Sequence, residues 1–221
     1  MPIVAVTQPV PVNPGGNFTT LLVDSPRGRV YAAHPGGNGV LVADADTGNQ
    51  IAIVAAGPVQ DIALDPASGH LFTANGDASS VSEIDPDAQQ VLRTAIVDAP
   101  VNRIRYDAAK GLIYADAAAG TRVFVIDAKT FEPKRTLTLP RKIDADAGCS
   151  EDVTRGWVAC ARDGSLTVYA DGAAPRKTLD SQKIAPGIED AAIDPKIGTI
   201  WVAWGDSNAG DGYIQGFTYR P

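Results

Sequence analysis

Six polar residues have side chains suited to metal binding and acid–base chemistry, and each stands at one end of a predicted strand: His34, Asp61, Asn75, Asn102, Glu189 and Asp190. Carboxylate and amide oxygens that converge on one point suit a hard cation such as Ca²⁺, which takes several oxygen ligands. We therefore expect Ca²⁺ as the cofactor. Its expected ligands are Asp61, Asn102, Glu189 and Asp190.

A metal ion in such a site could assist hydrolysis. It would polarise a carbonyl or phosphoryl oxygen and lower the pKa of a bound water. His34, or the carboxylate of Asp61 or Asp190, would then serve as the general base. Arg103 would orient an anionic substrate or stabilise developing charge. The alternative is that Arg103 pairs with Asp61 or its neighbours and keeps this region neutral.

Four further residues are expected to contact a substrate: Asn75, Asp116, Trp204 and Tyr213. The two aromatic residues flank the sequence GDSNAGDG (205–212), which we expect to be a flexible lid. Their rings would offer stacking surfaces to a sugar or an aromatic ligand. The alternative for both rings is packing in the core.

The elements that would position these residues form an internal repeat. Five segments share one register, and their starts lie 41, 42, 43 and 48 residues apart: VLVAD (40–44), VSEID (81–85), VFVID (123–127), LTVYA (166–170) and IQGFT (214–218). Each of these segments is preceded by two other strand-like segments. The first of the two ends in an Asp-led turn, as in IALDPASG (62–69), where Pro and Gly favour a tight hairpin. Units of about 40 residues with four strands are typical of propeller blades.

The strand count indicates how such a ring closes. The fifth unit has three strands before Pro221, and the N-terminal segment IVAVTQPVPVNPG resembles the outer strands of other units. We expect this segment to complete the last blade, which removes exposed sheet edges. The sequence therefore predicts an all-β, five-bladed β-propeller with four antiparallel strands per blade, in one domain over residues 1–221. The blades are expected over residues 18–57, 58–99, 100–140, 141–185 and 186–221, with residues 1–12 in the last.

Two segments, FTANGDASSVSEID (72–85) and IYADAAAGTRVFVID (113–127), resemble the signature of the YVTN-type β-propeller repeat family, a YVAN…VSVID strand–loop–strand. The resemblance covers essentially the whole chain and implies blades. This broad group includes propeller lactonase-like proteins. The oxygen-rich residues are similar in general character to the calcium sites of propeller lactonases and phosphotriesterases.

In a propeller, loops at one face converge on the central channel, where ligands usually sit. The residues that begin one set of these loops differ between blades: His34, Asn75, Asp116, Ala161 and Trp204. The residue before each is small: Ala33, Ala74, Ala115, Cys160 and Ala203. A core position repeats its chemistry, whereas a site needs different groups around one point, so the variation favours a site. The alternative is a set of solvated loop ends that vary freely.

Composition narrows the classes of partner. The chain has 44% hydrophobic and 20% charged residues, which argues against disorder. The net charge of −7, without a basic stripe, argues against a nucleic-acid partner. No apolar run approaches a membrane span, so we expect a soluble monomer that binds a small molecule. The start at MPIVAVTQPV lacks a signal peptide. The acidic, lysine-poor chain suggests a periplasmic or secreted protein whose signal peptide has been removed.

The two cysteines belong to the fourth blade. Cys160 aligns with alanines, which predicts a small buried hydrophobic residue. A disulfide with Cys149 is left open, because the two are not clearly opposite in the predicted hairpin and the distance requirement is strict.

Two functions follow from these patterns. The first is a metal-assisted hydrolase of a small ester, lactone or phosphotriester at the mouth of the channel. The alternative is a non-catalytic binding propeller for a small molecule, a glycan or a protein. The absence of GxSxG, P-loop, CxxC and HExxH patterns removes the easily recognised hydrolase, nucleotide, redox and zinc-protease classes.

Overall fold

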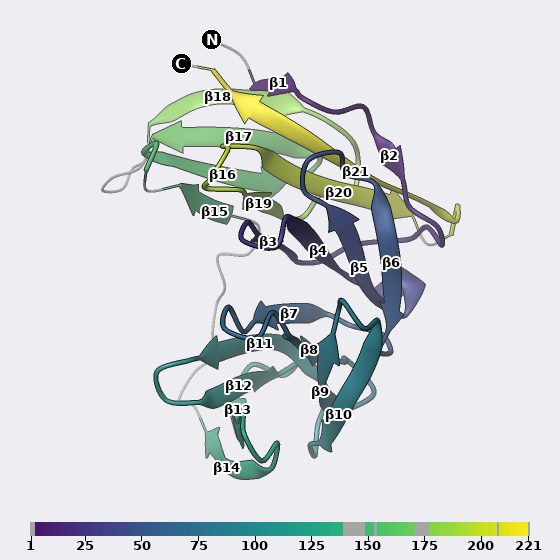
Figure 1. Cartoon of the computed structure of the whole chain (residues 1–221), viewed down its shortest axis with the longest axis vertical. Coiled ribbons are helices and arrows are strands. Elements are labelled where there is room, and N and C mark those ends of the chain that lie inside the picture. The colour runs from purple at the N-terminus through teal and green to yellow at the C-terminus, as the bar shows by residue number, and fades with distance from the viewer. Residues whose placement is uncertain (1–2, 139–148, 153, 171–176, 207, 221) are drawn as a thin grey trace. The chain divides into compact units, whose positions relative to one another are not determined.

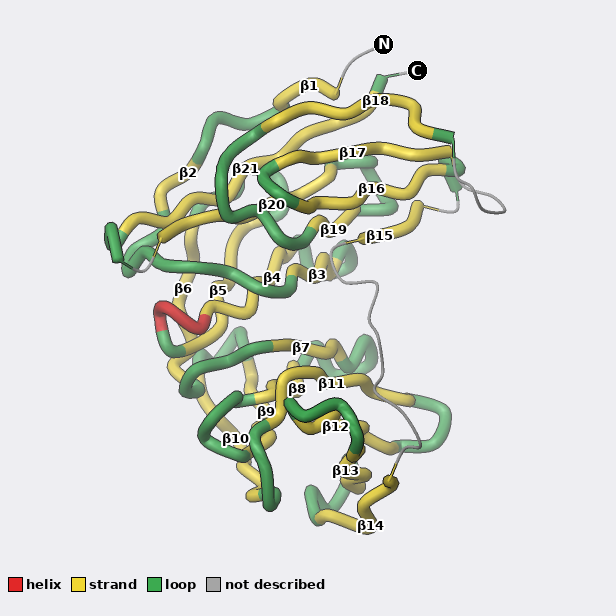
Figure 2. The backbone as a smooth tube through the Cα atoms, turned by 180° about the vertical axis from the view of Figure 1, so that it is seen from behind, coloured by secondary structure: helices red, strands yellow, loops and turns green. Residues whose placement is uncertain are grey.

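The computed structural model describes residues 3–138, 149–152, 154–170, 177–206 and 208–220 (Figure 1). The described residues form 21 strands and one short 3-10 helix, η1 (Pro35–Gly37), which connects two strands and is coloured red in Figure 2. The strands form five sheets.

Four of the sheets contain four strands each, in sequence order across the sheet. Blade 1 is β3 (Leu21–Asp24), β4 (Arg29–His34), β5 (Gly39–Asp44) and β6 (Gln50–Ala55). Blade 2 is β7 (Asp61–Leu64), β8 (Leu71–Ala74), β9 (Ser80–Asp85) and β10 (Gln90–Ile96). Blade 3 is β11 (Val101–Asp107), β12 (Leu112–Ala117), β13 (Arg122–Asp127) and β14 (Pro133–Thr138). Blade 4 is β15 (Cys149–Asp152), β16 (Trp157–Arg162), β17 (Ser165–Ala170) and β18 (Thr178–Lys183).

The fifth sheet joins the two ends of the chain. Blade 5 is β19 (Ala191–Ile193), β20 (Ile200–Asp206) and β21 (Asp211–Tyr219), and its fourth position is filled by β1 (Ile3–Ala5) and β2 (Val10–Pro11). Both N-terminal strands pair antiparallel with β21, with Ile3 opposite Tyr219 and Val10 opposite Ile214. The prediction that the N-terminal segment completes the last blade is therefore confirmed.

The chain divides into two compact units. The first contains residues 1–32, 41–51 and 146–221, and the second contains residues 33–40 and 52–145. In the first unit, Trp157, Leu166, Ile200 and Phe217 belong to one buried cluster shared by blades 4 and 5. In the second unit, a buried cluster shared by blades 2 and 3 includes Phe72, Val81, Ile104, Ile113, Phe124 and Phe131. Each cluster fills the space between neighbouring sheets of its own unit.

Asp-led turns shape the inner hairpins. Asp24, Asp107 and Asp152 each accept a hydrogen bond from the backbone N–H three residues later. In each turn the residue that donates this bond also brings a cation: Arg27, Lys110 and Arg155 pair with the same carboxylates. Local side-chain bonds of this kind favour turns over regular structure. The turns therefore fix where each inner strand ends.

Arginine side chains link neighbouring blades within each unit. In the first unit, Arg155 Nη1 of blade 4 donates to the carbonyl of Pro195 in blade 5, over 2.9 Å. In the second unit, Arg93 Nη2 of blade 2 donates to the carbonyl of Ala128 in blade 3, also over 2.9 Å. A guanidinium has five donors, so one side chain can bond its own blade and the next.

A disulfide crosses the inner hairpin of blade 4. Cys149 on β15 lies directly opposite Cys160 on β16, and the two sulfurs are bonded at 2.09 Å. The sequence did not place these residues opposite each other, and it predicted Cys160 as a small buried hydrophobic residue. That prediction was wrong: Cys160 is a half-buried partner in a covalent cross-link.

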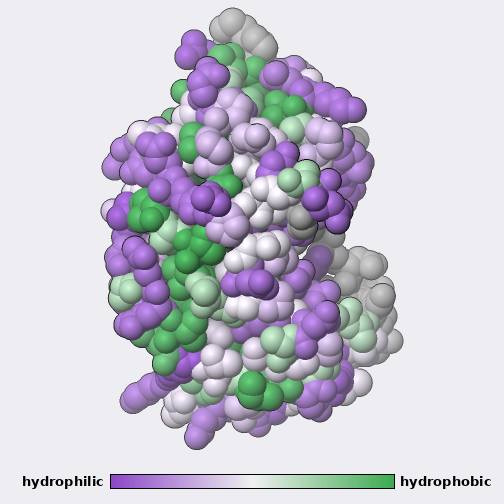
Figure 3. Space-filling model, turned by 90° about the vertical axis from the view of Figure 1, so that its right-hand side faces the viewer, coloured by the Kyte–Doolittle hydropathy of each residue, from purple (hydrophilic) through white to green (hydrophobic). Residues whose placement is uncertain are grey.

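Some apolar side chains remain exposed on outer strands. Val91, Leu92 and Ile96 of β10 are exposed, Ile96 by 70%. Figure 3 shows the side of the molecule that lies on the right in Figure 1, where hydrophobic side chains stand among hydrophilic ones. In that view several hydrophobic side chains adjoin one another and form a band bordered by hydrophilic ones. No helix among the described residues has the length and apolar character needed to cross a membrane.

Candidate functional site

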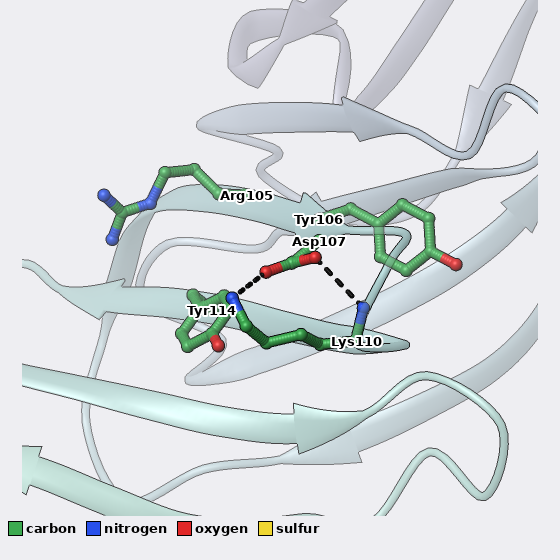
Figure 4. Close-up of a pocket in the computed structure, with 5 residues that line it drawn as sticks. All are labelled: Arg105, Tyr106, Asp107, Lys110 and Tyr114. Carbon is green, nitrogen blue, oxygen red and sulfur yellow. Dashed lines mark hydrogen bonds and ion pairs between the residues drawn. The ribbon is translucent and has the colours of Figure 1, made fainter.

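The inner hairpin of blade 3 carries an open pocket of about 370 Å³ (Figure 4). It is lined by Arg105, Tyr106, Asp107, Lys110 and Tyr114. Arg105 on β11 lies directly opposite Tyr114 on β12, so the two side chains share one face of the sheet. Lys110 comes from the turn between these strands, and in Figure 4 its ammonium lies beside Tyr114. The volume is within the range typical of small-molecule sites.

The charged groups of the pocket are already paired, but they are not equally accessible. Lys110 Nζ bonds Asp107 Oδ2 over 2.5 Å, and Arg105 Nη2 bonds Asp116 Oδ1 over 2.9 Å. The two cationic side chains are 65% and 58% exposed, whereas the carboxylates they bind are 26% and 7% exposed. The cations therefore face solvent, with the carboxylates behind them.

Three pKa values in the pocket are displaced. The hydrogen bond between Lys110 and Asp107 lowers the pKa of the carboxyl and raises that of the ammonium, so both groups stay charged at neutral pH. The pKa of Tyr106 is raised by burial, and then by the negative charges of Asp65, Glu83 and Asp107. Tyr106 is thus a neutral phenol at pH 7. Its ring contacts Phe72 of blade 2 with centroids 4.9 Å apart.

Asp116, one of the predicted substrate-binding residues, lies next to this pocket. It is 5% exposed, and burial raises its pKa although the nearby Arg105 and Arg103 oppose the shift. Its contact with Arg105 makes it a support for a residue of the pocket wall. Its predicted contact with a substrate stays a prediction.

Asp61 and Asp190 occupy the same place in blades 2 and 5 and make the same hydrogen bonds. Asp61 Oδ1 accepts from the N–H of Ile62 at 2.9 Å, and Oδ2 accepts from the N–H of Ile104 at 2.8 Å. Asp190 Oδ1 accepts from the N–H of Ala191 at 2.9 Å, and Oδ2 accepts from that of Leu21 at 2.7 Å. Ile104 and Leu21 belong to the next blade in each unit. Both carboxylates therefore join the innermost strands of neighbouring blades.

The other predicted ligands lie beside these carboxylates in sequence. Asn102 is exposed at a β-bulge, where the pairing register of β11 shifts between Val101 and Arg103. Glu189 is exposed just before Asp190, and Arg103 is half-buried. Within the described residues, no group of three or more His, Cys, Asp or Glu side chains is arranged to hold a metal ion. The four-residue calcium site, including its amide ligand Asn102, stays a prediction.

His34, predicted as a general base, is fully buried. It ends β4 and is covered by η1, in which a Cβ on Gly37 would come within 2.2 Å of the imidazole Cδ2. Only glycine leaves room for the ring at this point. A proton transfer from bulk solvent or substrate would require this segment to move. The assignment of His34 to catalysis stays a prediction.

Asn75, predicted to contact substrate, is 2% exposed within blade 2. Its Oδ1 accepts from the Thr73 hydroxyl at 2.6 Å, and its Nδ2 donates to the hydroxyls of Ser80 and Ser82 at 3.0 and 2.8 Å. Buried polar groups need such partners, because an unpaired amide costs free energy. These contacts give Asn75 a structural role inside its sheet.

Trp204 and Tyr213, which were expected to flank a lid, are cross-strand neighbours in a β-hairpin. They face each other across β20 and β21, with ring centroids 5.7 Å apart and an angle of 25° between the planes. Both are half-buried, and Trp204 also packs against the core of its unit. The segment between them was predicted as a flexible lid. Instead both strands continue through it, with Gly205 opposite Gly212 and Asp206 opposite Asp211.

None of the five pocket residues was predicted from the sequence. Three of them, Tyr106, Asp107 and Lys110, lie in YDAAKG (106–111), an Asp-led turn of the kind interpreted as a structural hairpin. Arg105, just before it, was passed over too. Charge was the available signal. Residues 101–138 contain seven Lys or Arg against four Asp or Glu, a formal charge of +3 in a chain of −7. This local excess marks blade 3 as different from the rest of the chain.

Comparison with known proteins concerns the fold. No protein-family model matches the chain, and no curated protein matches it either. Among solved structures it is similar to the Myceliophteria thermophila Cps50 (Swd1) β-propeller domain, with a TM-score of 0.66 and 11% identity, over 99% of this chain and 100% of that one. It is similar to the WD40 repeats of RRP9, with a TM-score of 0.65 and 9% identity, over 91% and 94% of the two chains.

A third similar structure is hydrazine synthase of Kuenenia stuttgartiensis, with a TM-score of 0.55 and 18% identity. The match covers 86% of this chain and 56% of that one, so the chain spans little more than half of that relative's length. Four four-stranded antiparallel sheets, a fifth whose outer position is filled by β1 and β2, and these neighbours define the class of the protein. It is an all-β, five-bladed β-propeller, as predicted. At these identities the likeness establishes the fold alone.

Proposed function

We propose that this chain is a non-catalytic β-propeller that binds a small molecule in the pocket of blade 3. One observation carries the proposal. Asp61 and Asp190, on which the predicted hydrolysis depends, each accept two backbone N–H bonds that join neighbouring blades. A carboxylate used in this way has less capacity left for a metal ion or a proton. An open pocket lies instead on the blade 3 hairpin.

The pocket itself supports binding. It presents two exposed cations, the Tyr114 phenol and one carboxylate on a hairpin whose strands pair over six residues each. Sites built on strands hold their side chains more precisely than sites on loops. None of the pocket residues forms a nucleophile–base pair with a histidine, serine or cysteine among the described contacts.

Binding and turnover can be separated by one experiment. A library of small metabolites is screened by ligand-observed NMR against the wild-type chain, against Tyr114→Ala and against Tyr169→Ala. Tyr169 is a matched half-buried tyrosine on blade 4. We expect saturable binding that is lost in Tyr114→Ala only, and no hydrolysis of esters, lactones or phosphotriesters. Hydrolysis that disappears in a folded Asp61→Asn variant would overturn the proposal and support the calcium-dependent hydrolase.

The repeat type belongs to the same proposal. We infer that the blades are of the YVTN type, because FTANGDASSVSEID covers β8, the following loop and β9 as a strand–loop–strand. The second matching segment covers β12 and β13 in the same way. A profile built from these blades should find YVTN repeats before other propeller repeats.

We also infer an exported protein from the cross-link in blade 4. Disulfides persist in oxidising compartments and are rare in the cytosol. The Cys149–Cys160 bond accounts for both cysteines of the chain. Alkylation of intact cells with a membrane-impermeant reagent, before and after reduction, tests this. Free thiols in protein taken directly from the cell would contradict it.

A further inference from the structure

We propose that the pocket of blade 3 binds an anionic sugar, meaning a sugar acid or a sugar phosphate. This inference rests on the proposed binding function and names the ligand class of the same site. It is carried by the order of side chains across the pocket, by their exposure, and by the charge of blade 3 relative to the other blades.

The pocket wall places two cations near one aromatic ring. Arg105 and Tyr114 are cross-strand neighbours on one face, and the Lys110 ammonium lies beside the phenol (Figure 4). An electrostatic interaction with Tyr114 also contributes to the raised pKa of Lys110, which places the two groups close together. A ring lying on Tyr114 would therefore have positive groups near it.

The exposed cations select for negative charge. Each uses one carboxylate that is more buried than itself, which leaves guanidinium and ammonium donors directed to solvent. Arg103 adds a third positive charge near Asp116. Charge-assisted hydrogen bonds from such groups to a carboxylate or phosphate are stronger than neutral ones.

Blade 3 is the basic part of an acidic chain. Residues 101–138 carry a formal charge of +3, whereas residues 61–96 of blade 2 contain one Lys or Arg against six Asp or Glu. The positive field is therefore confined to one blade. This favours a small anion over an extended polyanion, which would also meet the acidic blade.

The remaining lining groups favour a sugar ring over an aromatic one. The Tyr114 ring offers a flat apolar face, while the Tyr114 hydroxyl and the Asp107 carboxylate can bond hydroxyl groups. The pocket is open, so outward-facing hydroxyls of a bound sugar stay in water. A purely aromatic acid would leave the Tyr114 hydroxyl and the Asp107 carboxylate without a ligand hydroxyl to bond.

The test uses four probes on the full chain: glucuronate, glucose 6-phosphate, glucose and benzoate. Binding is followed by chemical-shift changes of backbone amides at low salt. We expect saturable shifts in residues 105–114 for glucuronate or glucose 6-phosphate, and the tighter of these two identifies the preferred anion. Weaker binding in 0.5 M NaCl is expected too, because salt screens exposed charges.

Variants locate the site. Lys110→Gln should weaken binding of the anionic sugars about two- to fivefold, the effect of one exposed ion pair. Lys129→Gln, which removes an exposed charge of the same blade outside the pocket, should leave it unchanged. Arg105→Gln should act like Lys110→Gln. Arg105→Gln leaves Asp116 without this partner, so the fold of the Arg105→Gln variant is checked by circular dichroism. If that variant unfolds, the test depends on Lys110→Gln.

The outcomes separate the two levels of the proposal. If glucose binds as tightly as the anionic sugars, the prediction that the ligand is anionic is wrong. If benzoate binds while neither anionic sugar does, the prediction that the ligand is a sugar is wrong. In both cases the binding function stands. If no probe shifts the 105–114 amides and the metabolite screen also finds no ligand there, both proposals fail.

Discussion

Asp61 and Asp190 show what a repeated residue does in this protein. They stand at the same position of blades 2 and 5, and each bonds its own next N–H and one in a neighbouring blade. Sequence spacing located both residues at the start of the innermost strand. It could not show their partners, because the N–H of Ile104 is 43 residues from Asp61 and that of Leu21 is 169 from Asp190. The residue types suited calcium chemistry equally well.

Asp127 provides a test of electrostatics at the same scale. Hydrogen bonds from Lys134, Thr130 and Lys129 lower its pKa to about 2. A carboxyl whose pKa is lowered on folding stabilises the folded state above its unfolded pKa of about 3.9, and this contribution is lost as the pH falls through about 2. Lys134→Ala should raise the Asp127 pKa toward the unfolded value, measured by NMR titration of the carboxyl carbon.

The control for this titration is Lys129→Ala, because the backbone N–H of Lys129 bonds Asp127 and its side chain does not. An Asp127 pKa that stays near 2 in Lys134→Ala would assign the shift to the backbone donors alone.

The pKa of Asp116 is displaced in the opposite direction. Its raised pKa opposes folding at neutral pH, and this opposition fades as the pH falls through the raised value.

At the scale of elements, the inner hairpin of blade 4 depends on its cross-link. The Cys149–Cys160 bond closes a loop of 11 residues' separation. In the chain-entropy account a loop of this size contributes about 3 kcal/mol by restricting the unfolded state. Reduction should therefore lower the urea midpoint of unfolding by an amount matching the Cys149→Ser/Cys160→Ser variant. The same reductant should not affect that variant. Equal midpoints for the oxidised chain, the reduced chain and the variant would show that the disulfide does not stabilise the fold.

The β20–β21 hairpin is a second element with a specific packing requirement. A Cβ on Gly205 would come within 2.2 Å of the Gly16 carbonyl oxygen and 2.5 Å of that of Asp211. Gly205→Ala should therefore destabilise the chain by about 1–3 kcal/mol through overpacking. The neighbouring exposed turn residue gives the control Asn208→Ala, which should change little. Equal thermal midpoints for both variants would show that the backbone near Gly16 moves to accommodate the added methyl group at little cost.

The same hairpin explains one error of the sequence analysis. Gly, Asp and Asn in GDSNAGDG (205–212) are typical of loops, which led to the lid prediction. Glycines 205 and 212 instead allow the backbone near Gly15 and Gly16 to approach the strands closely, with Gly16 N bonded to the Asp211 carbonyl at 2.7 Å. That tertiary contact favours extended strands, and nothing within the segment indicates it.

At the scale of the whole molecule, repetition made the fold predictable. Five segments in one register and a missing last strand indicated the five sheets, and Ile3 does pair with Tyr219. A binding site lacks this redundancy, since it depends on one hairpin. Arg105 and Tyr114 meet only through the register of β11 and β12, which the residue types alone do not indicate.

The central claim is that the innermost carboxylates hold blades together rather than a metal ion. It is tested most directly by measuring calcium content and the free energy of unfolding together, for the wild-type chain, Asp61→Ala and the exposed-loop control Asp77→Ala. The account predicts that Asp61→Ala lowers the free energy of unfolding by about 1–3 kcal/mol, the range for hydrogen bonds to a charged group. EDTA should leave the free energy of unfolding of every variant unchanged. One tightly held calcium per chain, lost in Asp61→Ala together with an EDTA-sensitive part of the stability, would contradict it.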